Sequence, residues 1–330
     1  MSWPSNETPR ELAAVIDLQL NDARVIVSGG ASGIGLACAG ALLRQGARVG
    51  VISRQEAAIE RALAGPLAAC EGRVRTAVAD VRDEASVSDA VVRLAAQLGG
   101  LDHVVASAGV EGEMGSPLED VTGPGFRDVL DVNVLGTFLV VKHATPHLKL
   151  GSNPSVTIIG SDSGFVAAPG MLAYNASKGA VVQLTRALSF EMYEDFGVRV
   201  NSVCPSITDT PMARRGMGVE SFDDVKFPVN SPEDVAWSVL FLCSPLSRAV
   251  NGVSLLSDFG YSGRSSFPAE RVRTTGRHGL AEDAAPGWFR RWALSLKLRS
   301  RHRPSGIRIS VVNDAFSTWM KAKPSLPVTW

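Results

Sequence analysis

The sequence predicts an α/β protein built on one doubly wound, seven-stranded parallel sheet, and three observations carry this prediction. Short apolar runs alternate with longer segments of helical periodicity over residues 24–257. The 330 residues are 45% hydrophobic and 20% charged, which is enough apolar material for a large buried core. Thirty-two glycines with only 6% aromatic residues favour tight strand-to-helix turns over an all-β sandwich. This composition excludes a disordered chain, a collagen-like fibre and a disulfide-stapled mini-protein.

Each predicted strand is a short apolar run, and a segment with helical spacing follows most of them. The first run, RVIVS at 24–28, ends in a glycine cluster, after which small and apolar residues recur with helical spacing. Strands that alternate with helices of this length indicate βαβ units with right-handed crossovers. The predicted strands are 24–28, 48–52, 74–79, 103–106, 155–160, 199–203 and one near 253–257. The predicted helices are 34–45, one from 55, 85–98, 125–148, 174–194 and 232–243.

The charge distribution divides the chain into a body and an appendage. The formal net charge is zero, which gives no overall field to attract nucleic acid. Residues 265–330 contain twelve basic and four acidic residues, whereas the rest of the chain contains 21 basic and 29 acidic residues. We therefore predict an N-terminal extension (1–20), one domain (21–264) and a basic C-terminal extension (265–330) that is largely irregular.

The basic extension contains a short aromatic and basic stretch, PGWFRRWALSLKLR at 286–299. Such a segment suits an anionic membrane surface or a partner groove. Its Arg/Pro/Ser-rich flanks are typical of solvated chain, so we favour disorder or weak docking onto the acidic body over membrane contact.

The cysteines and the N-terminus indicate a reducing compartment. The four cysteines are widely spaced, form no C-x-x-C pair and have no His neighbours suited to zinc, so we expect free thiols and no metal. The N-terminus has no signal-peptide pattern, and no apolar run is long enough to span a membrane. A cytoplasmic location is the resulting expectation.

A glycine-rich turn follows the first predicted strand. Residues 28–35 read SGGASGIG, with glycines in the spacing G-x-x-x-G-x-G. Such a turn lets the backbone approach a pyrophosphate, while free N–H groups at the start of the next helix face its negative charge. Turn geometry alone is the alternative, but the position in the first βα unit favours cofactor binding. The predicted contacts are Ser28, Gly29, Ser32, Gly33, Ile34 and Gly35.

The ends of the second and third strands predict which dinucleotide binds. No carboxylate follows the second strand, where one would bind an adenosine ribose, and Arg54 there suits a 2′-phosphate. NADP is therefore preferred as cofactor, with NAD possible, and a solvated charge is the alternative for Arg54. Asp80 and Val81 end the third strand, where they suit the adenine edge. Helix capping is the alternative for Asp80.

Four polar residues form a candidate catalytic set. Tyr174 and Lys178 are spaced i, i+4 and share a helix face. An ammonium beside a phenol lowers the pKa of the phenol toward the range of a general acid and base, which a carbonyl or alcohol requires when hydride is transferred. Ser161 ends a strand, within reach of the same oxygen. Asn133 lies in an apolar helical stretch, where it is suited to hold a water near Lys178. Each residue alone has an ordinary structural explanation, but the joint pattern favours catalysis.

In this combination the sequence resembles the short-chain dehydrogenase/reductase family over about residues 21–264. SGGASGIG matches the family's T-G-x-x-x-G-x-G loop, and ASAG at 106–109 matches N-N-A-G. The remaining matches are Asn133, Ser161, YNASK at 174–178 and VNSVCPSITDTPM at 200–212.

The resemblance implies a Rossmann-type fold and an NAD(P)-dependent oxidoreductase that interconverts a secondary alcohol and a ketone. It implies that Tyr174 donates and accepts the proton, and that Lys178 binds the nicotinamide ribose and tunes Tyr174. It also implies that Ser161 orients the substrate and that Asn133 supports a proton relay. Gly109, Thr208 and Thr210 are expected at the cofactor by the same resemblance.

The sequence departs from the family pattern at several positions. Ser28 stands in place of Thr and keeps the hydroxyl, whereas Ala106 and Ser107 replace two Asn and put one interstrand support in doubt. Ser206 replaces a usual Gly and adds a side chain beside the cofactor. FPVN at 227–230 stands where members often carry G-R, so the substrate loop is expected to close differently.

The predicted substrate lid, about 206–232, combines apolar and basic residues. Its apolar side chains favour an apolar or cyclic substrate, with packing of the lid against the body as the alternative. Arg214 and Arg215 keep a 3-oxoacyl-thioester reductase open as an alternative activity. The apolar residues in question are Met212, Met217, Phe222 and Phe227.

The resemblance also implies a homodimer or homotetramer assembled through the helices that bear Asn133 and Tyr174. A function of another class stays open, a non-catalytic dinucleotide-sensing scaffold that acts through the basic extension. The intact set of Ser161, Tyr174 and Lys178 argues against this alternative, because loss of turnover would allow these residues to drift.

Overall fold

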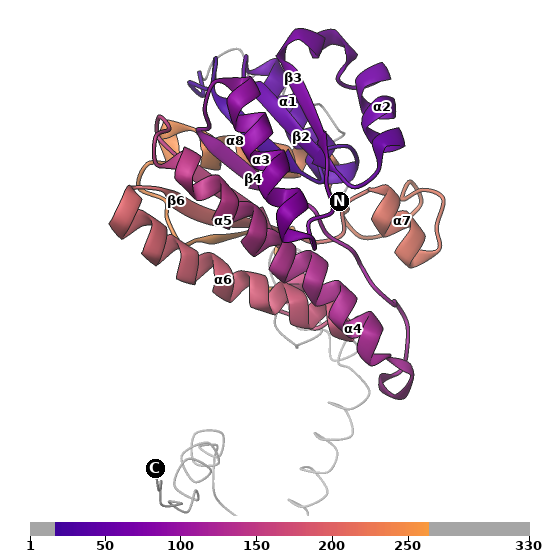
Figure 1. Ribbon diagram of the computed structural model, residues 1–330. Helices are drawn as coiled ribbons and strands as arrows, with labels where there is room; N and C mark the ends of the chain where they lie inside the picture. Colours follow the sequence, from indigo (N-terminus) through magenta and orange to yellow (C-terminus); the bar gives the residue numbers. More distant parts are fainter. Residues whose placement is uncertain (1–16, 264–330) are drawn as a thin grey trace, which may run out of the picture. The chain divides into compact units, whose positions relative to one another are not determined.

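The computed structural model describes residues 17–263. The expectations for residues 1–16 and for the basic extension, including 286–299, lie outside the described residues. Seven parallel strands form one sheet in the order β3-β2-β1-β4-β5-β6-β7 (Figure 1). The doubly wound α/β fold with a seven-stranded sheet is therefore confirmed. The strands are β1 (Arg24–Ser28), β2 (Arg48–Ser53), β3 (Val74–Val78), β4 (His103–Ala106), β5 (Ser155–Ile159), β6 (Arg199–Pro205) and β7 (Ser254–Ser257).

Helices cover both faces of the sheet. Two of them, α1 and α8, pack together on one face, whereas α3, α5 and α6 lie on the other, which faces the viewer in Figure 1. No helix within residues 17–263 has the length and apolar character that a membrane crossing requires. The helices are α1 (Gly33–Arg44), α2 (Glu56–Ala64), α3 (Glu84–Leu98), α4 (Gly123–Leu130), α5 (Gly136–Leu148), α6 (Leu172–Phe196), α7 (Pro211–Met217) and α8 (Pro232–Cys243).

The strands are buried on both faces, which explains why they are continuous apolar runs in the sequence. In β1, Val25 and Val27 point into the cluster beneath α1 and α8, and Ile26 points into the cluster beneath α3 and α5. All three side chains have no exposed surface. The two cores therefore hold the sheet from both sides and leave its carboxyl edge open for polar groups.

The single helix expected over residues 125–148 consists of three segments in the structure. A π-helical turn, η4 (Asp131–Leu135), separates α4 from α5. Both flanking segments keep their apolar spacing, so periodicity alone does not reveal the wider turn between them. The lid contains a short helix, α7, that begins after Thr210, whose hydroxyl accepts the N–H of Ala213. Short 3-10 turns occur at Ala68–Arg73, Leu118–Asp120, Asp162–Gly164 and Pro245–Ser247.

The strand order reverses between β1 and β4. The chain runs outward from β1 to β2 and β3 on one side, and continues from β4 to β7 on the other. Such a reversal opens a crevice at the carboxyl ends of the strands, which is where doubly wound proteins bind their ligands. The loops after β1, β4, β5 and β6 all leave the sheet at this edge.

Candidate active site

The turn after β1 is shaped by glycines that no other residue can replace. Gly29 has φ +67°, and an added Cβ would lie 2.8 Å from Ala108 Cα in the loop after β4. A Cβ on Gly35 would lie 2.3 Å from the Gly29 carbonyl oxygen. The turn therefore brings backbone from β1 and β4 into close contact at the point where the strand order reverses.

The first turn of α1 has the character of an anion site. Ser32 precedes the helix without a side-chain hydrogen bond to it, and the first turn contains no acidic residue. The N–H groups at this end are therefore available to a negatively charged group. Gly33, with φ +50°, faces Thr210, whose Cγ2 would lie 3.4 Å from an added Cβ. This cradle fits the pyrophosphate of a dinucleotide, with Ile34 and Gly35 continuing the helix.

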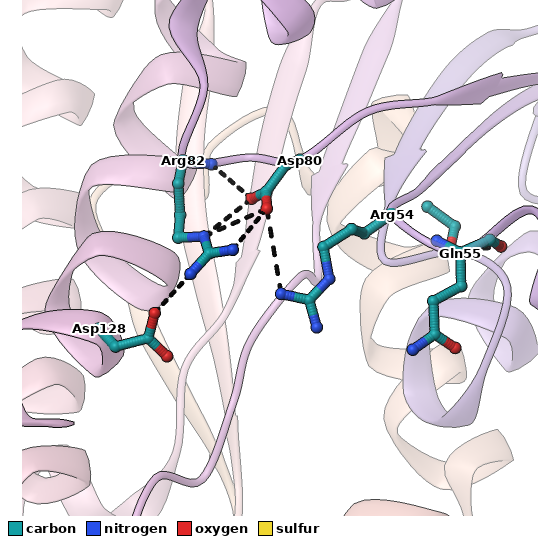
Figure 2. A network of polar contacts seen from close by, with 6 residues as sticks. Arg54, Gln55, Asp80, Arg82 and Asp128 are labelled. Atoms are coloured by element: carbon teal, nitrogen blue, oxygen red, sulfur yellow. Dashed lines mark hydrogen bonds and ion pairs between the residues drawn. The ribbon is translucent and has the colours of Figure 1, made fainter.

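The residues expected at the adenosine end lie together beyond β2 and β3. Arg54 follows β2, and its Nη1 lies 3.9 Å from Oδ2 of Asp80 (Figure 2). Val81 is buried against Gly136 at the start of α5. Ser53 and Gln55 flank Arg54, so the end of β2 carries no acidic side chain.

Asn133 lies in the π-helical turn and is completely enclosed. Its Oδ1 accepts the N–H of Val110 at 2.8 Å, and its Nδ2 donates to the Val110 carbonyl at 3.0 Å and to Ser177 Oγ at 2.9 Å. Because wider turns often occur at functional sites, the position of Asn133 in one is informative. This side chain ties the loop after β4 to α6, close to Gly109, whose added Cβ would lie 3.2 Å from Asn133 Oδ1.

Lys178 and Tyr174 project from α6 toward the same edge. The Lys178 side chain is buried, with its Nζ donating to the Ile159 carbonyl at 2.9 Å and lying 5.5 Å from the centre of the Tyr174 ring. Ser161 follows β5 and is also buried. The structure thus brings together all four candidate catalytic residues.

The pKa of Tyr174 shifts in the direction opposite to the one expected from Lys178. Burial raises the pKa of Tyr174 to about 12, hydrogen bonding with Ser161 opposes this rise, and the charges of Asp162 and Glu111 add to it. Burial also lowers the pKa of Lys178 to about 8. The reason for the difference is that Lys178 directs its amino group to the Ile159 carbonyl, and that burial penalises the charged form of both groups.

A carboxylate that the sequence analysis did not single out lies beside Ser161. The Ser161 hydroxyl donates to Asp162 Oδ1 at 3.1 Å and accepts the N–H of Ser163 at 3.1 Å. Burial raises the pKa of Asp162 above its usual value, and the charge of Asp258 adds to this rise. The single hydroxyl hydrogen of Ser161 therefore has two neighbouring acceptors, Asp162 and Tyr174.

The lid is held by two ion pairs. Arg214 of α7 binds Asp209 with both ends of its guanidinium, at 2.6 and 2.8 Å. Arg215 donates to Glu111, in the loop after β4, at 2.8 and 3.1 Å. Both lid arginines therefore already have a carboxylate partner. The pair of Arg215 and Glu111 joins α7 to the opposite side of the crevice.

Comparison with known proteins places this geometry in a family. The family model described as enoyl-(acyl carrier protein) reductase matches residues 29–262, most of the chain. The chain is 35% identical to 2-(S)-hydroxypropyl-CoM dehydrogenase 3 of Xanthobacter autotrophicus over 253 residues, which is 73% of this chain and 97% of that protein. The chain belongs to the short-chain dehydrogenase/reductase family. Family membership makes it an oxidoreductase that acts on CH–OH groups with a nicotinamide dinucleotide.

Other short-chain dehydrogenases are similarly close to the chain. Cis-4-hydroxycyclohexanecarboxylate dehydrogenase of Sinomonas cyclohexanicum is 36% identical over 245 residues, 72% of this chain and 95% of that protein. A 3-ketoacyl-(acyl-carrier-protein) reductase from Brucella melitensis, solved with NADH, is 29% identical with a TM-score of 0.67, and the match covers 74% of this chain and 99% of that one. ElxO, solved with NADP, is 26% identical with a TM-score of 0.68, covering 74% and 100%.

The departures from the short-chain dehydrogenase pattern have local explanations. Ser28 keeps the interstrand link, because its Oγ accepts the N–H of Ala108 at 3.4 Å. Asn230 contacts Ser206: its Nδ2 lies 3.4 Å from Ser206 Oγ and donates to the Ser257 carbonyl at 2.8 Å. The FPVN segment thus supplies a buried Asn that holds the loop bearing Thr208.

Three residues near the carboxyl edge of the sheet belong to no sequence motif, so the sequence analysis did not select them. Asp162 and Glu111 influence Tyr174 through charge, and Arg82 binds Asp80. The signal for Asp162 is its position directly after Ser161, and the signal for Arg82 is its position two residues after Asp80. Glu111 has no such signal, because its partner Arg215 is distant in sequence. Within residues 17–263 no cluster of three or more His, Cys, Asp or Glu side chains is arranged to hold a metal ion.

Replacing Asn133 with Ala is expected to lower the free energy of unfolding by about 2–3 kcal/mol, because both polar groups of the Val110 backbone lose a buried partner. Urea denaturation followed by circular dichroism measures the change. The exposed Gln97 on α3 is the matched control, and Gln97→Ala is expected to change stability by less than about 0.5 kcal/mol. Equal effects of the two substitutions would show that the hydrogen bonds from Asn133 to Val110 do not stabilise the protein.

Proposed function

We propose that the protein is an NADP-preferring oxidoreductase that interconverts a secondary alcohol and a ketone, with Tyr174 as general acid and base. The observation that carries the proposal is the convergence of Tyr174, Lys178, Asn133 and Ser161 at the carboxyl edge, beside the glycine cradle. When bound, the nicotinamide dinucleotide supplies or takes up hydride at the substrate carbon. The side chains of this protein must then manage the proton at the substrate oxygen.

The environment of Tyr174 suits it to donate this proton and to accept it in the reverse reaction. Its raised pKa keeps the phenol protonated at neutral pH, which is the form that donates to a carbonyl oxygen as ketone becomes alcohol. In the reverse direction the phenolate accepts the alcohol proton, and a nearby positive charge on Lys178 favours that form. Ser161 donates to the same substrate oxygen once its hydroxyl turns away from Asp162.

Tyr174→Phe is expected to reduce kcat for ketone reduction about 10³-fold, because the ring stays while the proton donor is lost. Cofactor binding, measured by calorimetric titration, is expected to persist. The exposed Tyr193 on the same helix provides the control, and Tyr193→Phe is expected to leave kcat unchanged. Full activity in Tyr174→Phe would overturn the mechanism.

Asp162→Asn is expected to shift the pH dependence of alcohol oxidation to lower pH. The negative charge of Asp162 disfavours the phenolate of Tyr174, so removing it lowers the pKa of Tyr174 and increases the phenolate fraction at a given pH. The rising limb of kcat/KM against pH reports this change. Asp195→Asn, at an exposed position on α6, serves as the control, and the prediction fails if both variants keep the wild-type profile.

The lid favours an apolar or cyclic substrate. Phe222 is buried and packs the lid, whereas Met212 and Phe227 are partly exposed and Met217 is exposed. Arg214 and Arg215 are occupied by Asp209 and Glu111, which weakens the case for a charged thioester. The similarity to a hydroxycyclohexanecarboxylate dehydrogenase also supports a cyclic substrate. Comparing cyclic ketones with 3-oxoacyl thioesters in a reductase assay tests this choice, and turnover of the thioesters alone would contradict it.

Arg54 is the proposed ligand of a 2′-phosphate. Its side chain is 54% exposed at the end of β2, a position without a carboxylate that would favour the NAD ribose. Replacing Arg54 with Asp is expected to reverse the preference, with kcat/KM for NADPH falling about tenfold or more relative to NADH. Steady-state rates with both cofactors measure the ratio. An unchanged ratio would show that Arg54 does not recognise the phosphate.

A homodimer through α5 and α6 is the proposed assembly. Leu135 and Phe138 are about 40% exposed and border a shallow apolar depression that continues onto Ala180 and Leu184 of α6. An apolar patch of this kind is typical of an interface between subunits. Phe138→Asp is expected to lower the molar mass measured by light scattering from that of an oligomer to that of a monomer. A monomeric wild-type protein would contradict the proposal.

A further inference from the structure

Four charged side chains form a connected network beyond β2 and β3 (Figure 2). Arg82 donates from its backbone N–H to Asp80 at 3.0 Å, and from its guanidinium to both Asp80 oxygens at 2.7 to 3.2 Å. Its Nη1 donates to Asp128 of α4 at 2.5 Å. Arg54 approaches Asp80 from the other side, at 3.9 Å.

The two arginines engage Asp80 very unequally. Arg82 holds the carboxylate through a fork of short hydrogen bonds, which is the strongest form of an Arg–carboxylate contact. Arg54 is at the outer limit of an ion pair, and about half of its side chain is exposed. Arg82 thus takes up most of the hydrogen-bonding capacity of Asp80, and Arg54 keeps only a marginal contact with this carboxylate.

Asp128 fixes the position of Arg82. It lies on α4, on the far side of Arg82 from Asp80, so the guanidinium is held between two carboxylates (Figure 2). The hydrogen bonds from Arg82 hold the pKa of Asp80 below its usual value, so Asp80 stays charged at neutral pH. A permanent charge at this position would attract Arg54 and repel a phosphate if Arg82 were absent.

We propose that Arg82 is a specificity-determining residue for the cofactor. By holding Asp80, it leaves Arg54 to bind the 2′-phosphate and shields that phosphate from the Asp80 carboxylate. The inference rests on the proposed preference for NADP and extends it from Arg54 to a positioning residue. Arg82 acts through Asp80, and this distinguishes the proposal from a direct contact between Arg82 and the phosphate.

Calorimetric titration of the full chain with NADP⁺ and with NAD⁺ tests the proposal without turnover. Arg82→Gln is expected to lower the preference for NADP⁺ about five- to tenfold, mainly through weaker NADP⁺ binding. Unchanged NAD⁺ binding shows that the variant is folded. The exposed Arg93 of α3 is the matched control for charge, and Arg93→Gln is expected to change the preference less than about twofold.

The double variant Asp80→Asn/Arg82→Gln is the decisive measurement. If Arg82 acts by neutralising Asp80, removing both charges restores the wild-type preference, whereas a direct contact between Arg82 and the phosphate leaves it impaired and overturns the proposal. If Arg82→Gln weakens both cofactors, Asp80→Asn alone provides the second variant. It removes the carboxylate that Arg82 neutralises, so the preference for NADP⁺ is expected to stay or rise, and a fall in that preference overturns the proposal.

Arg54→Gln separates this inference from the proposed cofactor preference. A loss of preference in Arg54→Gln together with none in Arg82→Gln overturns only the role of Arg82. A wild-type protein that binds NAD⁺ more tightly than NADP⁺ overturns both.

Discussion

The reversal of strand order between β1 and β4 is the constraint on which the site depends. At that point the turn after β1 lies so close to the loop after β4 that a Cβ on Gly29 would lie 2.8 Å from Ala108 Cα. The close approach aligns the N-terminus of α1 with the crevice. Two residues after Ala108, the backbone of Val110 is bound by Asn133. The proposed cofactor cradle and the proposed catalytic residues therefore lie at the same reversal of strand order.

Polar groups at this edge are buried only where the fold provides partners for them. Asn133 satisfies a backbone loop and Ser177, and Lys178 donates to the end of β5. Burial penalises a charge on Tyr174 or Lys178, which raises the pKa of Tyr174 to about 12 and lowers the pKa of Lys178 to about 8, so at neutral pH Tyr174 is neutral and Lys178 is still mostly charged. In the proposed mechanism, Tyr174 and Ser161 are the close donors for the substrate oxygen. The same requirement for partners governs the charged network around Asp80.

The fold could be predicted from sequence because doubly buried strands are continuous apolar runs, and helices between them repeat with a clear period. The glycine loop and the set of Ser161, Tyr174 and Lys178 could be singled out as candidates because of their spacing, and the structure brings them to the same edge of the sheet. The π-helical turn at Asn133 could not be predicted from the sequence, because the two helices that flank it share one apolar pattern. The sequence also could not predict that Arg82 binds Asp128 or that Arg215 binds Glu111. These partners are 46 and 104 residues away and meet only through the tertiary fold.

The central claim is that the protein transfers hydride from a nicotinamide dinucleotide to the carbonyl carbon of a ketone. The most direct test follows this hydride with a deuterium label. The purified protein is incubated with NADPH or NADH that carries deuterium at both positions of the reactive carbon of the nicotinamide, together with a panel of cyclic ketones, and the products are analysed by mass spectrometry. The account predicts an alcohol with one deuterium on the former carbonyl carbon, formed faster with NADPH. An alcohol without deuterium, or no alcohol from a protein that binds the cofactor, would contradict it.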